Sequence, residues 1–131
     1  MKKRFILLAL VAITLAGCPA PATVPGTPTV DPFIQQTALA AQGLVAAKTA
    51  VIASAVAVDG LCTQNLMPQA ECDIAADSYS KAESVYMSAK AALAVGIDTR
   101  DLSNYTQKSA DLNKLLQQLA DSIAKFQGGA K

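Results

Sequence analysis

The chain has 131 residues, of which 52% are hydrophobic and 16% charged, and its formal net charge is +1. This length suits one domain, and the small net charge leaves no basic patch of the kind that binds nucleic acid. Histidine is absent, which removes the commonest general base and the commonest metal ligand of proteins. Composition therefore argues against an enzyme, against a metal or cofactor site, and against a nucleic-acid partner.

The chain opens with an apolar run, Phe5–Leu15, behind three cationic residues, Lys2, Lys3 and Arg4. This is the pattern of a secretory signal peptide, and the run is shorter than a transmembrane helix of about 20 residues. An uncleaved anchor helix is the alternative, which the small residues at the end of the run disfavour. We therefore predict that residues 1–17 are removed on export. The mature chain would then carry eight cationic and ten acidic residues.

The last residue of this run, Leu15, is followed by Ala16, Gly17 and Cys18. This stretch resembles the lipobox of bacterial lipoproteins, and the resemblance covers residues 1–18. It implies that the sulfur of Cys18 carries a diacylglycerol, that cleavage makes Cys18 the new N-terminus, and that Gram-negative bacteria acylate its amine. Each buried methylene of such an anchor contributes about 0.8 kcal/mol, so several chains hold a protein firmly on a membrane. An ordinary buried thiol is the alternative role of Cys18.

The residue after the cysteine bears on the location. Lipoproteins of enterobacterial type often stay in the inner membrane when Asp follows the Cys, whereas Pro19 follows Cys18 here. The resemblance therefore implies anchoring on the periplasmic face of the outer membrane.

Residues 18–32 are rich in proline, with five of the six prolines of the chain at positions 19, 21, 25, 28 and 32. Proline fixes its own φ and biases the preceding residue toward extended conformations, so we expect a semi-stiff spacer. At about 3.1 Å per residue it would reach roughly 40 Å and hold the next domain off the membrane. A proline-rich ligand for a periplasmic partner is the alternative. In composition the segment is also similar to the outer-membrane subunit of phage spanins.

From Phe33 onward the pattern becomes helical, and we expect a helical domain over residues 33–127 and a flexible tail at residues 128–131. The first helix is apolar over most of its circumference between Gly43 and Val58, with one charge, Lys48. Such a helix is usually central in a bundle. A transmembrane helix is the alternative, which Lys48 disfavours. Gly60, soon after Val58, predicts the end of this helix.

The second and third helices each carry an apolar seam with alternating spacings of three and four. The seam of the second helix alternates large and small residues: Cys72, Ala75, Tyr79, Ala82, Tyr86, Ala89 and Leu93. Ile74, Val85 and Val95 widen its apolar face. The third seam comprises Leu102, Tyr105, Ser109, Leu112, Leu116, Leu119, Ile123 and Phe126, with Ser109 as its one polar member. Both seams are typical of helices packed against neighbours in a bundle.

Short connections join the three helices. Gly96 predicts the end of the second helix, and Asp98 is the predicted N-cap of the third. Connections this short favour antiparallel neighbours. We therefore predict an all-α fold, an antiparallel three-helix bundle with up-down-up topology.

Two cysteines remain besides Cys18. Cys62 lies just past the predicted end of the first helix, and Cys72 lies near the start of the second. An exported chain folds in an oxidising compartment, so we predict a disulfide across the first hairpin, which contributes roughly 3 kcal/mol in the chain-entropy model. A redox-active pair is the alternative, although the spacing is not C-x-x-C.

These features predict a lipid-anchored helical module rather than an enzyme. The first hypothesis is a non-catalytic binding or scaffolding lipoprotein, held on the membrane by the lipid on Cys18, with a protein partner in the envelope. The second is an exclusion or lysis accessory lipoprotein encoded by a phage or plasmid. The third is a structural homo-oligomer with the first helix as its shared core.

Overall fold

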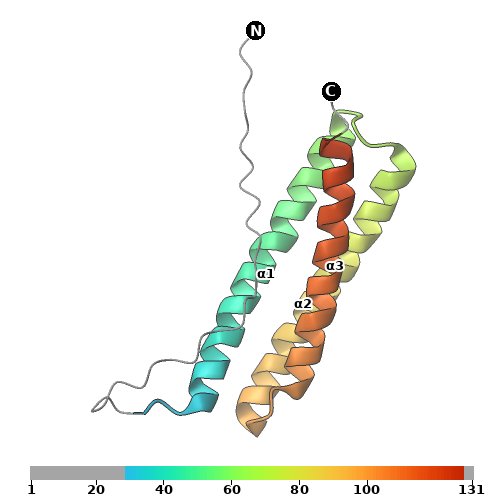
Figure 1. Cartoon of the computed structure of the whole chain (residues 1–131). Helices are drawn as coiled ribbons and strands as arrows, with labels where there is room; N and C mark the ends of the chain where they lie inside the picture. The colour runs from blue at the N-terminus through green and yellow to red at the C-terminus, as the bar shows by residue number, and fades with distance from the viewer. Residues whose placement is uncertain (1–28, 129–131) are drawn as a thin grey trace.

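The computed structural model describes residues 29–128. They form three helices, α1 (Pro32–Thr63), α2 (Gln69–Thr99) and α3 (Ser103–Gln127), and no strand occurs within this range. The helices lie side by side, and each contacts the other two (Figure 1). The all-α class and the three helices predicted from the sequence are thereby confirmed.

The start of α1 is built from an acidic cap and a proline. The backbone N–H of Phe33 donates to Oδ1 of Asp31 at 2.9 Å, which satisfies one of the unpaired donors of the first turn. Pro32 occupies the first helical position, where its missing N–H costs nothing. The helix therefore begins at Pro32, one residue before the predicted boundary.

Both glycine stops predicted from the sequence are wrong. α1 continues through Gly60 to Thr63, and α2 continues through Gly96 to Thr99. A glycine inside a helix costs about 1 kcal/mol, which helix packing can offset. The left-handed backbone conformation instead falls in the two connections, at Asn65 with φ of 54° and at Arg100 with φ of 56°.

The predicted cap of α3 is also wrong. Asp98 lies inside α2, because α2 continues beyond Gly96. The side chain of Asp101 takes over this role at the start of α3, where its Oδ1 accepts the backbone N–H of Ser103 at 2.9 Å.

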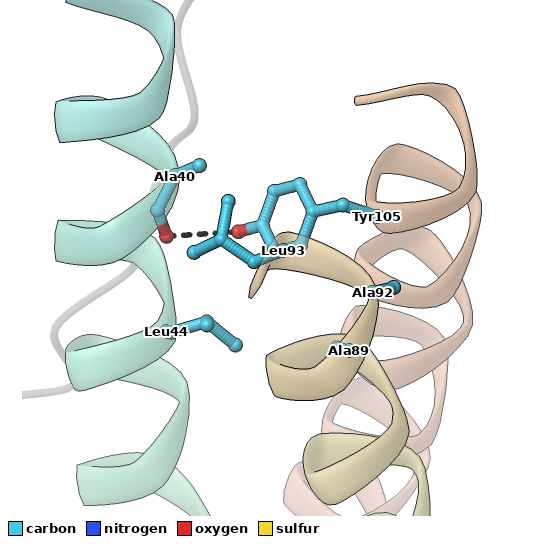
Figure 2. Close-up of a cluster of buried hydrophobic side chains, with 6 residues drawn as sticks. All are labelled: Ala40, Leu44, Ala89, Ala92, Leu93 and Tyr105. Atoms are coloured by element: carbon cyan, nitrogen blue, oxygen red, sulfur yellow. Dashed lines mark hydrogen bonds between the residues drawn. The ribbon is translucent and has the colours of Figure 1, made fainter. Parts of the chain in front are cut away.

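The core consists of three layers of buried side chains, and each layer draws on all three helices. The first layer, shown in Figure 2, comprises Ala40, Leu44, Ala89, Ala92, Leu93 and Tyr105. The middle layer comprises Ala47, Val51, Ala82, Leu112 and Leu119. The third comprises Val58, Leu61, Met67, Cys72, Ala75 and Ile123. The predicted seams of α2 and α3 supply most of these residues, and every seam position is buried or partly buried.

The predicted central position of α1 is wrong. In a three-helix arrangement every helix has two neighbours and one free side, so no helix is surrounded. The free side of α1 leaves Val45, Ile52 and Val56 exposed. Ile74 and Val95 on α2 are exposed too, although the sequence pattern assigned them to the apolar face of that helix.

Candidate functional site

The predicted site residues fall into two groups. Leu15, Ala16, Gly17 and Cys18 lie outside the described residues. Cys62 and Cys72 do come together at disulfide distance, with their Cα atoms 6.0 Å apart. Cys62 lies in the last turn of α1 rather than past its end, because the helix continues through Gly60.

A groove of about 500 Å³ runs between α1 and α3, which we call the α1/α3 groove. Its α1 wall is made largely of small residues, Ala40, Gly43, Ala46 and Ala47. Small side chains would let two helices approach closely, yet α1 contacts α3 less than it contacts α2. The groove therefore remains open along the N-terminal half of α1. Its volume lies within the range of small-ligand sites, about 300–1,000 Å³.

Tyr105 joins the two walls of the groove. Its hydroxyl donates to the backbone carbonyl of Ala40 at 2.9 Å, the bond drawn as a dashed line in Figure 2. Tyr105 is buried, and this bond satisfies its polar end, as buried tyrosines require. Gly43 lies next to it: a Cβ there would lie 3.5 Å from the Tyr105 hydroxyl oxygen, which is ordinary van der Waals contact.

The polar side chains that line the groove are all neutral. They are Gln36 on α1 and Tyr105, Thr106, Ser109 and Asn113 on α3. Amide and hydroxyl groups both donate and accept hydrogen bonds, but none of them is an acid or base near neutral pH. The groove can therefore hold an uncharged, mainly apolar segment and orient it by hydrogen bonds.

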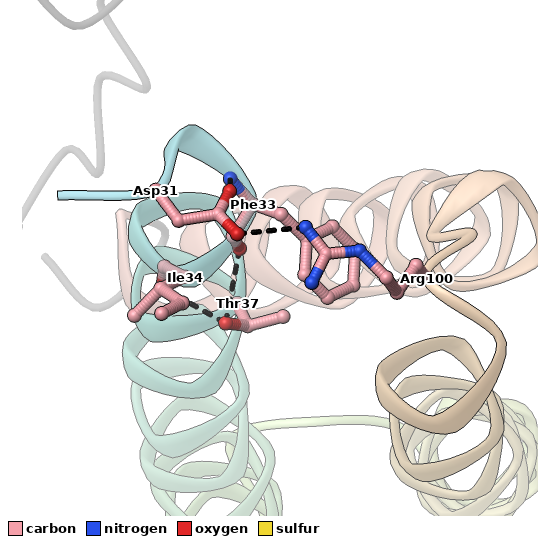
Figure 3. Close-up of polar contacts among 5 residues, drawn as sticks. All are labelled: Asp31, Phe33, Ile34, Thr37 and Arg100. Atoms are coloured by element: carbon pink, nitrogen blue, oxygen red, sulfur yellow. Dashed lines mark hydrogen bonds and ion pairs between the residues drawn. The ribbon is translucent and has the colours of Figure 1, made fainter.

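A polar cluster fixes the end of α1 against the turn between α2 and α3 (Figure 3). The Arg100 guanidinium donates to Oδ2 of Asp31 at 2.7 Å and lies 4.7 Å from the centre of the Phe33 ring. The hydrogen bond from Arg100, followed by the one from the Phe33 N–H, holds the pKa of Asp31 below its usual range. The cluster therefore ties the start of α1 to the turn that precedes α3.

A second, smaller pocket of about 320 Å³ lies between α1 and α2, next to the cysteine pair. Asp59 and Asp73 line it, together with Gln69 and Tyr79. Two carboxylates are fewer than a calcium site uses. Within residues 29–128 no group of three or more His, Cys, Asp or Glu side chains is placed to hold a metal ion.

The comparisons with other proteins do not identify a functional site, so the site is argued from geometry alone. No known protein family, no curated protein and no solved structure matches the chain. Among the described helices, α1 alone is long and apolar enough to cross a membrane, by length and composition only. The α1/α3 groove is therefore the strongest candidate for a functional site.

The sequence held a partial signal for the groove. Ser109 interrupts an otherwise apolar seam, and in the structure it lines the groove instead of the core. The small residues of α1 do not by themselves predict a groove, because alanine is also common in close-packed helix contacts. The opposing wall at Tyr105 could not be inferred, since it lies 65 residues from Ala40 along the chain.

Proposed function

We propose that the protein is a membrane-anchored periplasmic lipoprotein whose helical domain is a non-catalytic binding or scaffolding module for an envelope component. The lipobox sequence Leu15–Cys18 supports the anchor, and Pro19 supports the outer membrane as its location. The observation that carries the binding role is the α1/α3 groove, an open apolar channel with only neutral polar groups in its walls.

The three helices run up, down and up in this proposal. The composition of the core layers supports these directions. One layer joins Ala40 near the start of α1 with Leu93 near the end of α2 and Tyr105 near the start of α3. Another joins Leu61 near the end of α1 with Cys72 near the start of α2 and Ile123 near the end of α3.

The chemistry of the groove favours a protein segment as its partner. The groove lies along two helices, and an amphipathic helix laid in such a groove buries its apolar face there. The neutral side chains of Ser109 and Asn113 suit the polar edge of that helix. The residues that line the groove include no carboxylate, imidazole, amine or thiol, and the Tyr105 hydroxyl already donates to the Ala40 carbonyl, so the lining offers neither a general base nor an activated nucleophile.

In-cell photocrosslinking tests the proposed binding role. A photoreactive residue at Asn113, in the groove, is expected to capture one envelope protein in high yield. The same residue at Gln107, exposed on α3 and outside the groove lining, is the matched control. Equal capture from both positions, or none from Asn113, would contradict the groove as the binding site.

Metabolic labelling with palmitate tests the anchor separately. The wild-type chain is expected to incorporate label, and Cys18→Ala is expected to remain unlabelled and uncleaved. The variant Cys62→Ala is the control, because it removes a cysteine that the lipobox does not include. Normal labelling of Cys18→Ala would refute the lipobox interpretation.

A further inference from the structure

The free side of α1 carries an apolar stripe that no described part of the chain covers. Val45 is 67% exposed, Ile52 is 51% exposed and Val56 is 67% exposed. Spacings of seven and four place the three side chains on one face of the helix. We call them the outer stripe. Thr49, which is also exposed, lies between Val45 and Ile52 on this face. An exposed apolar surface on an unpartnered helix face can mark a contact with another molecule.

Two charged residues border the outer stripe, Lys48 and Asp59, and α1 holds no other charge. They lie 11 residues apart, and since three helical turns span about 10.8 residues, both fall on the same edge of the stripe. Both are exposed. The ion pairs found within residues 29–128 are Lys81 with Asp77 and Arg100 with Asp31, so neither Lys48 nor Asp59 takes part in one.

We infer that the outer stripe is the contact surface for a second copy of this chain, with the two α1 helices packed antiparallel. A two-fold axis perpendicular to both helices, midway between Lys48 and Asp59, passes between Ala53 and Ser54. It brings Lys48 of each copy opposite Asp59 of the other, and it keeps these charges on the same edge of the contact. Ile52 and Val56 lie next to the axis, where the contact is closest.

A parallel arrangement does not satisfy these charges. Its two-fold axis runs along the helices, so each edge of one stripe faces the opposite edge of the other. Lys48 and Asp59 would then face the other copy without a partner of opposite charge. A closed, self-complementary contact is also the commonest form of homodimer, so the antiparallel pair requires nothing unusual.

The surface area buried in the contact sets the expected affinity of the dimer. Burying three half-exposed aliphatic side chains and the alanines around them in each copy covers on the order of 1,000 Å² in total, at the low end for a specific interface. We therefore expect a weak dimer in solution, with a Kd on the order of 100 µM. Confinement of both copies to one surface would raise their effective concentration. The dimer does not depend on the groove function proposed above.

Sedimentation equilibrium of the mature chain, residues 18–131 with Cys18→Ser, tests the contact between 10 µM and about 1 mM. Wild type is expected to dimerise, and Ile52→Ser is expected to weaken the dimer at least tenfold. Ile74→Ser is the matched control, because Ile74 is 59% exposed on α2 and lies outside the stripe. Val56→Thr, a near-isosteric exchange at an exposed site, provides a second test if Ile52→Ser lowers helicity. Monomer throughout, or equal effects of Ile52→Ser and Ile74→Ser, would overturn the inference.

Charge reversal tests the direction of packing. Lys48→Asp and Asp59→Lys are each expected to weaken the dimer about fivefold, since each places like charges opposite one another. The double variant exchanges the two charges and is expected to restore the wild-type Kd within about twofold. A double variant as weak as the single ones would refute the antiparallel pair. Monomeric protein that cosediments with phosphatidylethanolamine–phosphatidylglycerol vesicles, and loses this binding in Ile52→Ser, would identify the membrane as the occupant and refute the dimer.

Discussion

Two glycines inside helices are predicted to respond in opposite directions to the same substitution. Gly60→Ala in α1 meets no atom within 4 Å of the added Cβ, so the variant should gain the ordinary helix advantage of about 0.5–1 kcal/mol. A Cβ at Gly96 in α2 would lie 2.7 Å from the backbone oxygen of Asp101 and 2.9 Å from Cδ2 of Leu102. The turn into α3 cannot easily yield there, because the N–H of Asp101 donates to the Gly96 carbonyl at 3.0 Å.

The magnitude for Gly96→Ala follows from these contacts. Overpacking costs about 1–3 kcal/mol, which exceeds the helix advantage, so we expect a net loss of about 1–2 kcal/mol. For a folded region of this size, that loss corresponds to a fall in Tm of about 5–15 °C, whereas Gly60→Ala should raise Tm by a few degrees. Urea denaturation of the oxidised protein, followed by circular dichroism, measures the free energy of unfolding of both variants. A Gly96→Ala variant as stable as Gly60→Ala would refute the close approach of α2 to this turn.

Three further changes test the core, the cysteine pair and the cap of α1. Leu112→Ala, at a side chain that is 1% exposed, should lower the free energy of unfolding by about 2–5 kcal/mol. Leu39→Ala, at a half-exposed site, should lower it by under about 1 kcal/mol. Similar losses for the two variants in urea denaturation would contradict the middle layer of the core. Non-reducing peptide mapping should recover Cys62 linked to Cys72, and reduction should lower the unfolding free energy by roughly 3 kcal/mol. Two free thiols in protein isolated without reductant would refute the bond. The folded pKa of Asp31 is lowered, so its charge stabilises the fold above the ordinary value of 3.8, and this contribution is lost as the pH falls through the folded pKa. Asp31→Asn should therefore have a slightly lower Tm than wild type at pH 7 and an equal Tm near pH 2, and a pH-independent difference would refute the role of the charge.

The parts of the fold that the sequence predicts well are those in which one helix alone carries the signal. The seam from Leu102 to Phe126 repeats at spacings of three and four, and burial follows the same period because a helix presents one face to its neighbours. The seam of α2 is predictable for the same reason. Periodicity therefore predicts α2 and α3 and the seams that they bury without knowledge of their partners.

The wrong predictions concern features that depend on contacts with another part of the chain. Gly60 and Gly96 look like helix ends, but both lie inside helices, and the close approach of Asp101 to Gly96 is a contact with the following turn. α1 looked central because its composition is apolar all round, yet the number of its neighbours depends on the arrangement of the other helices. The α1/α3 groove likewise needs two walls that are distant in sequence.

The arrangement at the two ends of α1 has a mechanical consequence. A pull on the chain from its N-terminal side would act first on Asp31 and would load its contact with Arg100 and then the bond from Tyr105 to Ala40. These contacts would open one after another, so α1 would separate from the other helices starting at its N-terminal end. At the opposite end, the bond predicted between Cys62 and Cys72 would keep the peeled helix hinged to α2. Tension would then separate α1 from the other helices only as far as Cys62, where the disulfide would hold it to α2.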